Sequence, residues 1–182
     1  MQEIKDTTLG SDARSVVQRV RSHAIRGLPL LVVLSGPSHA GKSTLAREIN
    51  KVGDNFRIIS PDQIRTQLSV SFGVPEYEAK VWNIYESIKL KALENDYNVI
   101  LDACHMSEQA RWHSLQGKNS KFRKICIVFD LPLQTIRERC IREKRLSLSE
   151  AERMWEAFQK SKPTQNELKR LGFNEVYFIY EG

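Results

Sequence analysis

A nine-residue stretch, "GPSHAGKST" at positions 36–44, most constrains what this chain can fold into. It places two glycines, a lysine and a serine at the spacing of a phosphate-binding loop. The glycines of such a loop let the backbone curl so that successive N–H groups point at phosphate oxygens, and the following helix adds its positive N-terminal end. The apolar run "LLVVLS" precedes the stretch and the helical pattern "STLAREIN" overlaps its end. Strand, loop and helix in this order predict a nucleoside triphosphate site.

The loop supplies the predicted ATP site, with ATP and Mg²⁺ as the expected cofactors. We expect the Lys42 ammonium to reach the β- and γ-phosphates and the Ser43 hydroxyl to bind Mg²⁺. His39 either touches a phosphate or is simply exposed, and the second interpretation is favoured. The predicted ATP-binding residues are Gly36, Pro37, Ser38, His39, Ala40, Gly41, Lys42, Ser43 and Thr44.

Short apolar runs alternate with helical patterns from residue 30 to the end of the chain. This alternation predicts an α/β fold with a parallel sheet of about five strands and helices on both faces. An amphipathic helix is expected over 11–27, within an N-terminal extension spanning 1–27, and a single domain is expected over 28–182. The expected strands are the runs "PLLVVLS", "FRIIS", "NVILDA", "KICIVFD" and "EVYFIY".

Charge and cysteine content narrow the class of protein. The 28 basic and 22 acidic side chains leave a net charge of +6, which favours an anionic partner such as nucleic acid, although a solvated basic surface would look the same. The three cysteines show no CxxC spacing, so we expect no disulfide, no zinc site and a cytoplasmic location. Because no apolar run approaches the ~20 residues that span a bilayer, no membrane partner is expected.

The segment "IISPDQIR" places Asp62 just beyond the second predicted strand, with Arg65 one helical turn later. Ligands of open α/β sheets bind outside this edge. A carboxylate there can accept the proton of an attacking hydroxyl, and an arginine beside it can hold an acceptor phosphate. The alternative is structural, with Asp62 capping a helix and Arg65 pairing with it. Both interpretations remain open from the sequence.

The segment "VILDACHMSEQAR" places Asp102 at the end of the third predicted strand. An acid in this position can hold a water of the Mg²⁺ shell, so we predict that Asp102 supports the metal through water and lies near the acceptor. His105 and Arg111 follow as candidate acceptor-binding residues. For both of them a structural role is an equally good interpretation.

The segment "RERCIREKR" at 137–145 is a basic helical pattern that follows the fourth predicted strand. A solvated helix face is the ordinary interpretation of such a run. Its position resembles that of the mobile arginine lid in small P-loop kinases, which closes over ATP and excludes water. On that interpretation Arg139 and Arg142 are candidate catalytic residues.

Taken in order, "GPSHAGKSTLAREI", "DQIR", "VILDACHMSEQAR" and "FDLPLQTIRERCIREKR" resemble the 5′-kinase module of the polynucleotide kinases, among the small P-loop phosphotransferases. The resemblance spans roughly residues 30–180. It implies a P-loop kinase fold with a helical arginine lid. It further implies that Asp62 is the general base for a 5′-hydroxyl, that Arg65 binds the neighbouring phosphate of the acceptor, and that Lys42 and Ser43 handle ATP and Mg²⁺.

Two positions depart from the family pattern. Cys104 stands where the family usually has Thr or Ser, and the residue four after Arg139 is Glu143, while Arg142 is three after it. The second lid arginine is therefore not identified by spacing.

Three functions follow from these residues. The favoured hypothesis is ATP-dependent transfer of the γ-phosphate to the 5′-hydroxyl of a DNA or RNA end. A kinase of small molecules such as a sugar, nucleoside or antibiotic would use the same fold, and a non-catalytic nucleotide-binding module would need no base at Asp62. Base stacking could involve Trp82, Tyr85 or Trp112, but their helical spacing favours packing in the core.

Overall fold

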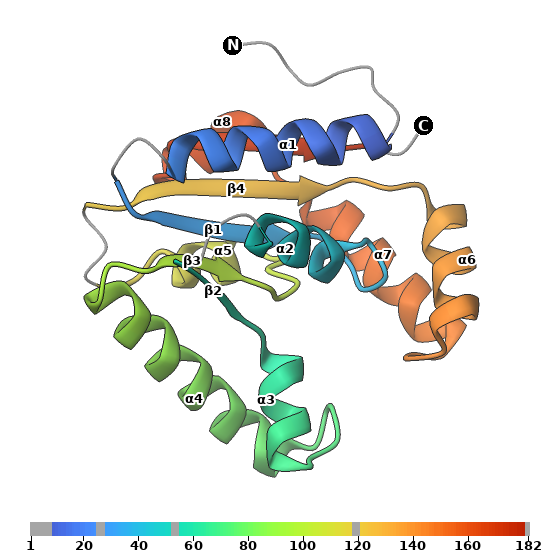
Figure 1. Ribbon diagram of the computed structural model, residues 1–182. Helices are drawn as coiled ribbons and strands as arrows, with labels where there is room; N and C mark the ends of the chain where they lie inside the picture. Colours follow the sequence, from blue (N-terminus) through green and yellow to red (C-terminus); the bar gives the residue numbers. More distant parts are fainter. Residues whose placement is uncertain (1–8, 25–27, 52–54, 118–120, 181–182) are drawn as a thin grey trace.

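The computed structural model of this chain describes residues 9–24, 28–51, 55–117 and 121–180, and for residues 9–12 it describes the backbone alone. Strands and helices alternate along the chain, as the sequence predicts (Figure 1). Within the described part of the chain, no helix is long and apolar enough to cross a membrane.

The centre of the molecule is a five-stranded sheet in which all neighbouring strands are parallel, with the order β2-β3-β1-β4-β5. The middle strand, β1, pairs with β3 on one side and β4 on the other, so that Val33 lies opposite Leu101 and Cys126. Every residue of β1 is buried, as expected of a parallel strand covered on both faces. The strands are β1 (Leu30–Ser35), β2 (Phe56–Ile59), β3 (Asn98–Leu101), β4 (Arg123–Phe129) and β5 (Glu175–Ile179).

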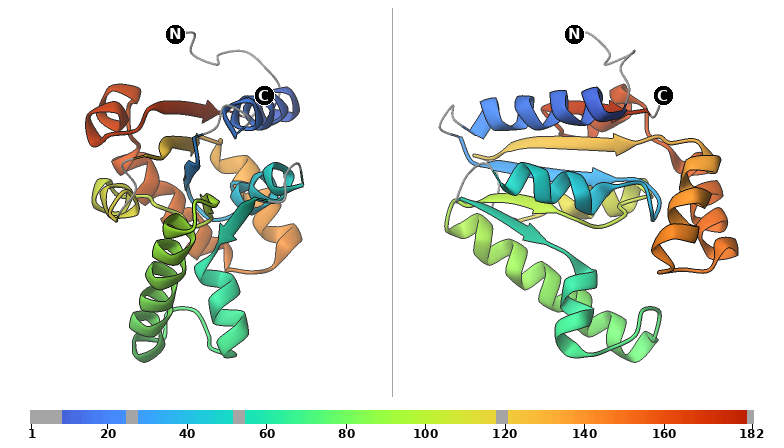
Figure 2. Two further views of the ribbon diagram at one scale, coloured as in Figure 1. Left: turned by 60° about the vertical axis from the view of Figure 1, so that its left-hand side comes forward. Right: turned by 45° about the vertical axis from the view of Figure 1, so that its right-hand side comes forward.

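Helices cover both faces of the sheet, which confirms the predicted layers. Two views show α1 and α2 on one face and α4, α5 and α8 on the other, while α3, α6 and α7 lie toward the carboxyl ends of the strands (Figure 2). The helices are α1 (Leu9–Ala24), α2 (Lys42–Asn50), α3 (Pro61–Leu68), α4 (Pro75–Glu94), α5 (Glu108–Ser114), α6 (Leu133–Glu143), α7 (Leu148–Ser161) and α8 (Gln165–Leu171).

Alternation along β1 divides the core into two apolar clusters. Val32 and Leu34 join the cluster beneath α1 and α2, whereas Leu31 and Val33 join the cluster beneath α4 and α5. The helix predicted for 11–27 is observed as α1 as far as Ala24, and residues 25–27 lie outside the described part of the chain. Its buried Val16, Val17 and Val20 belong to the first cluster. Helix α1 is therefore packed onto the same sheet that carries the predicted nucleotide loop.

Two local details differ from the sequence interpretation. Asp62 does not cap α3, because Ser60 is the N-cap residue and Pro61 takes the first helical position, where its missing N–H has no cost. The basic helix ends at Glu143, since Lys144 adopts a left-handed conformation with φ of 52°, and Arg145 therefore leaves the helix axis.

The expectation that three aromatic residues pack in the core holds for only one of them. Tyr85 is buried, whereas Trp82 and Trp112 are exposed on α4 and α5. Helical spacing identifies a shared face but does not identify which face the sheet covers.

Candidate active site

The predicted phosphate-binding loop lies at the carboxyl end of β1, between the ends of β3 and β4. The Gly36 N–H donates to the Cys104 carbonyl at 2.9 Å, which ties the loop to the segment after β3. A Cβ at position 36 would lie 2.9 Å from the Cβ of Phe129, so only glycine fits this close approach. Gly41 has φ of 92° and is the N-cap of α2, which directs the N-terminus of that helix at the loop.

Lys42 and Ser43 begin α2, and their side chains contact different partners. The buried Lys42 ammonium donates to the Pro37 carbonyl, so its charge lies within the curl of the loop. The Ser43 hydroxyl donates a hydrogen bond to the Asp102 carboxylate. Two hard oxygen donors thus meet beside the loop, which is the ligand chemistry that Mg²⁺ prefers.

Asp102 is held in a dry position. Burial raises the pKa of the Asp102 carboxyl above its ordinary value, opposed by the hydrogen bond from Ser43 and by the charge of Lys42. The negative charge of Asp62 raises it further, which places the acids that follow β2 and β3 within electrostatic reach of one another.

The Asp62 carboxylate is exposed and lies between two arginines from distant parts of the chain. Its Oδ1 accepts from Arg65 Nη1 at 2.6 Å, and its Oδ2 accepts from Arg145 Nη2 at 2.8 Å. The Asp62 and Arg145 side chains are 55% and 58% exposed, so this ion pair is screened by solvent and costs little to open. The pairing of Asp62 with Arg65 that the sequence allows is therefore observed, although without the helix cap.

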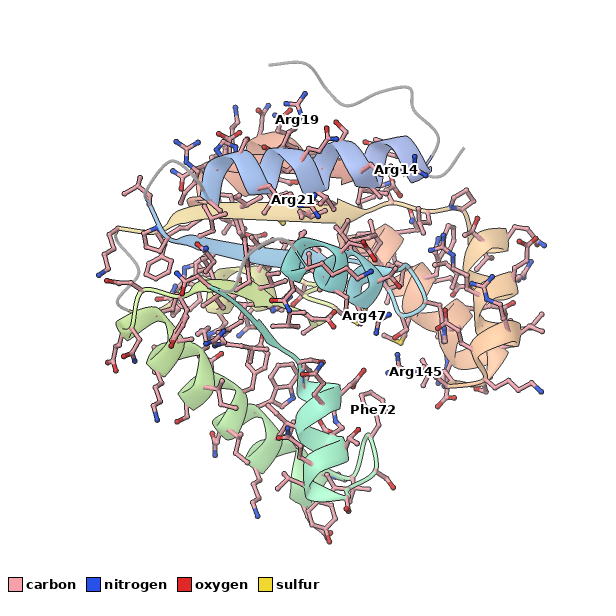
Figure 3. The ribbon with its side chains drawn as sticks, in the orientation of Figure 1. Arg14, Arg19, Arg21, Arg47, Phe72 and Arg145 are labelled. Carbon is pink, nitrogen blue, oxygen red and sulfur yellow. The ribbon has the colours of Figure 1, made fainter. Side chains whose placement is uncertain are left out.

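Arg65 is buried, and its orientation is fixed by Glu78 of α4. Arg65 Nε and Nη2 donate to the two carboxylate oxygens of Glu78 at 2.9 and 2.8 Å. This hydrogen bonding raises the pKa of Arg65 and lowers the pKa of Glu78. The Arg65 guanidinium also lies 4.8 Å from the ring centre of Phe72, which is 65% exposed (Figure 3). A cation and a free aromatic face therefore adjoin Asp62.

His105 and Arg111, predicted as acceptor contacts, are buried and donate hydrogen bonds to backbone carbonyls. His105 Nδ1 donates to the Leu34 carbonyl at 2.8 Å, and desolvation lowers the pKa of His105 to about 4, so the ring is neutral. Arg111 Nη1 donates to the carbonyls of His105 and Met106 at 3.1 and 2.6 Å. His105 therefore holds the segment after β3 against β1, and Arg111 ties the same segment to the Ser161 carbonyl at the end of α7.

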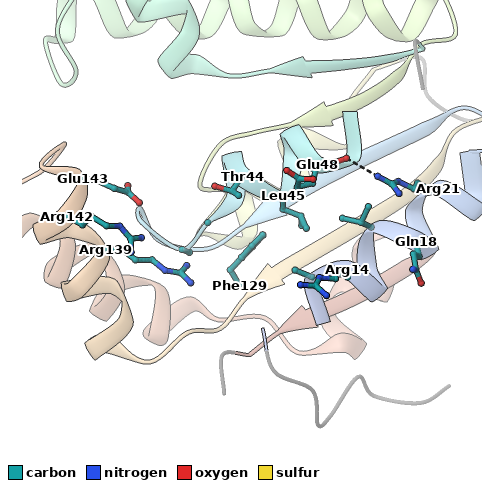
Figure 4. A pocket seen from close by; sticks show the side chains of 14 residues that line it. Arg14, Gln18, Arg21, Thr44, Leu45, Glu48, Phe129, Arg139, Arg142 and Glu143 are labelled. Atoms are coloured by element: carbon teal, nitrogen blue, oxygen red, sulfur yellow. Dashed lines mark hydrogen bonds between the residues drawn. The ribbon is translucent and has the colours of Figure 1, made fainter. Parts of the chain in front are cut away.

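Two basic residues of α6 lie beside the phosphate-binding loop, whereas Arg145, just after the helix, lies beside Asp62. Arg139 Nη1 lies 3.4 Å from the His39 carbonyl, and Arg139 and Arg142 line a cavity beside the loop (Figure 4). His39 is buried, contrary to the favoured interpretation that it is exposed, and its Nδ1 lies 2.8 Å from Glu143 Oε2. Arg145, beyond the helix, is the basic residue of this segment that reaches Asp62.

Two contributors to this site, Glu78 and Phe72, were not identified from the sequence. The segment that carries them, "SVSFGVPEYE", reads as a loop followed by a helix and contains no motif. A carboxylate one turn into a helix that follows the Asp–Arg pair is the only signal that could have indicated Glu78.

Proteins of known structure share the fold of this chain. A family model described as an AAA domain matches residues 31–162, and no curated protein matches the chain. A chain in the structure of the Pnkp1/Rnl/Hen1 RNA repair complex is similar, with 27% identity over 74% of this chain and 45% of that chain and a TM-score of 0.65. A second structure of the Pnkp1/Rnl/Hen1 complex shows 32% identity over 62% of this chain and 39% of that chain, with a TM-score of 0.53.

The present chain covers less than half the length of the matched chain in each of these two complexes. Shikimate kinase from Acinetobacter baumannii is similar in fold, with 18% identity over 88% of this chain and 89% of that chain and a TM-score of 0.53. The predicted resemblance to small P-loop phosphotransferases is confirmed, and the fold supports nucleotide binding and ATP-dependent phosphotransfer. Because the family model covers most of the sequence, the chain belongs to the AAA domain family of P-loop proteins and has the fold of the small P-loop kinases.

Proposed function

We propose that this protein is an ATP-dependent kinase that transfers the γ-phosphate to the 5′-hydroxyl of a DNA or RNA end. The observation that carries the proposal is the exposed Asp62 carboxylate, which lies within electrostatic reach of Asp102, beside the buried and fixed Arg65. A nucleotide switch needs no such base. A kinase needs one where an alcohol can approach the transferred phosphoryl group.

The donor is held by residues of the loop at 36–44. Backbone N–H groups and the N-terminus of α2 bind the phosphates, and the Lys42 ammonium exchanges its contact with the Pro37 carbonyl for phosphate oxygens. Ser43 would hold a Mg²⁺ ion directly and Asp102 would hold it through water, and the ion would supply positive charge to the phosphates. Arg139 and Arg142 hold the donor from the side of α6.

In the proposed transfer step, Asp62 acts as the base. The acceptor oxygen forms a bond to the γ-phosphorus, the bond between that phosphorus and the bridging oxygen breaks, and ADP leaves. The acceptor proton passes to Asp62 Oδ2, the oxygen that accepts a hydrogen bond from Arg145 Nη2. We assign to Arg145 the role of the second lid arginine, because its exposed ion pair with Asp62 would cost little to open and would free the guanidinium to stabilise charge on the transferred group.

Three features support a nucleic acid as the acceptor. Arg65 lies next to Asp62, where it can hold the phosphate that follows a 5′-hydroxyl nucleotide. Phe72 presents an exposed ring over Arg65, on which a terminal base can stack. The RNA repair complex chain is similar over most of this sequence, and the net charge is +6.

The test is end labelling. Wild-type protein is incubated with γ-labelled ATP, Mg²⁺ and 5′-hydroxyl DNA and RNA oligonucleotides, beside the same oligonucleotides with 5′-phosphates as controls. We expect label on the 5′-hydroxyl ends alone. Labelling of shikimate, gluconate, nucleosides or aminoglycosides, with none on either oligonucleotide, would instead establish a small-molecule kinase. Tight ATP binding without transfer to any hydroxyl would leave only a nucleotide-binding module.

A further inference from the structure

A cavity of about 550 Å³ lies between α1, α2 and α6, next to the phosphate-binding loop (Figure 4). Gly41 and Thr44 of the loop form one end of it, together with Arg139 of α6. Helix α1 forms the opposite wall, from which Arg14 and Gln18 project. Its volume falls within the range of small-molecule sites, about 300–1,000 Å³.

The wall formed by α1 is fixed, and it lies outside the residues that match the family model. Val16 and Val20 are fully buried in the core, and Arg21 Nη2 donates to the Glu48 carbonyl of α2 at 3.3 Å. The family match begins at residue 31, after α1 has ended at Ala24. This chain therefore carries a cavity wall that the matched family segment does not include.

The floor of the cavity suits a flat heterocycle. Phe129 at the end of β4, Leu45 of α2 and Val17 of α1 line it with apolar atoms, and all three residues are almost completely buried. An aromatic ring that covers these apolar atoms removes them from water, which favours its binding.

Side chains at the edge of the cavity carry hydrogen-bonding groups that a ligand could contact. The Gln18 amide is exposed and carries both donors and an acceptor, and Arg14 offers a forked set of donors. Arg21 Nε is buried without a hydrogen-bond partner among the described residues. Unpaired buried donors are costly, so a ligand with oxygen or nitrogen acceptors would relieve this one.

We propose that α1 is the recognition wall for the nucleoside of the phosphate donor. Gly41 and Thr44 belong both to the loop and to the cavity, so a nucleotide whose phosphates occupy the loop extends its ribose and base into this space. The base lies on the surface of Val17, Leu45 and Phe129, and Gln18 and Arg14 contact its polar edge or the ribose hydroxyls. This inference rests on the donor half of the proposed function and is independent of the acceptor.

The experiment compares a nucleotide with its bare phosphate chain. Isothermal titration measures the affinity of ATP and of inorganic tripolyphosphate, each with Mg²⁺, for wild type and for the double variant Arg14→Ala/Gln18→Ala. Loss of two hydrogen-bonding side chains should weaken ATP binding about tenfold or more, while tripolyphosphate binding changes less than about twofold. Arg19→Ala, an exposed charge change on α1 that does not line the cavity, is the matched control and should leave both affinities unchanged.

A second variant, Ala13→Phe, fills part of the cavity and should also reduce ATP affinity selectively, with thermal unfolding confirming that each variant is folded. Equal losses for ATP and tripolyphosphate, or no loss for either, would overturn the proposal. Since no acceptor is present in the titration, a failure to label oligonucleotides leaves this result intact. If the protein labels oligonucleotides and the α1 variants bind ATP as tightly as wild type, the inference about α1 is refuted and the proposed function is not.

Discussion

The donor half and the acceptor half of the site are built in opposite ways. On the donor side one contiguous loop supplies the backbone, and buried residues such as Lys42, Asp102 and His105 surround it. On the acceptor side exposed side chains from distant segments meet beside the buried Arg65, as Asp62 meets Arg145 across 83 positions of sequence. Rigid backbone suits a ligand that is always a triphosphate, whereas exposed side chains can be replaced without disturbing the sheet. We therefore expect substitutions to alter the choice of acceptor more readily than the binding of the triphosphate.

The largest expected effect is on the donor side. Lys42→Met removes the positive charge at the centre of the loop while retaining an unbranched side chain of similar length. Loss of a charge that stabilises the transferred phosphoryl group should lower kcat about 100- to 1,000-fold. Steady-state transfer to a 5′-hydroxyl oligonucleotide measures this, and a variant with near-normal kcat would show that the loop does not hold the reacting phosphates.

The next effect is a pH dependence of folding stability that arises from His105, whose ring bonds to the Leu34 carbonyl just before the loop. Burial lowers the pKa of His105 from 6.5 to about 4, so the unfolded chain binds more protons than the folded one between these values. Stability should therefore fall as the pH falls from about 6.5 toward 4, by about 3 kcal/mol from this group alone.

The pH dependence of urea unfolding measures this loss. His105→Asn should flatten the profile in that interval, whereas the exposed His113→Gln should retain the wild-type slope. An unchanged slope in the His105 variant would contradict a neutral, buried ring at this position.

A smaller effect is expected at the acceptor side. Phe72→Ala removes the exposed ring over Arg65, which should raise the KM for a 5′-hydroxyl oligonucleotide about tenfold and leave the KM for ATP unchanged. Tyr77→Ala removes another exposed aromatic side chain, from the first turn of α4, and serves as the control. Recovery of the normal KM by Phe72→Trp, but not by Phe72→Leu, would distinguish stacking from simple apolar contact.

The smallest expected effect is a gain in stability on substitution of Asp102, the acid proposed to support Mg²⁺ through water. Because burial raises the pKa of Asp102, the folded chain binds more protons than the unfolded one above the ordinary aspartate range, and the carboxylate reduces stability as the pH rises. Asp102→Asn keeps an oxygen that accepts from Ser43 and removes the buried charge. Its Tm should exceed that of wild type at pH 7 and not at pH 3, while its Mg²⁺-dependent ATP affinity falls. A lower Tm at pH 7 would contradict this.

The two halves also differed in how far the sequence could predict them. The loop and the acids that follow β2 and β3 were predictable, because local spacing and strand ends determine where such residues lie. The contacts of Arg65 with Glu78, and of Asp62 with Arg145, depend on tertiary packing and on the left-handed turn at Lys144, which no periodic pattern encodes. The wall formed by α1 was missed for the same reason, since its amphipathic pattern predicts a helix but not what the helix covers.

The proposed function requires the Asp62 carboxylate to accept the proton of an alcohol beside a bound triphosphate. The most direct test measures single-turnover phosphoryl transfer and ATP affinity together for wild type and Asp62→Asn, a substitution of nearly equal volume. Loss of a general base predicts transfer slowed about 100- to 10,000-fold, with ATP affinity unchanged within about twofold. Transfer at the wild-type rate, with ATP bound equally well, would contradict the assignment of Asp62 as the base.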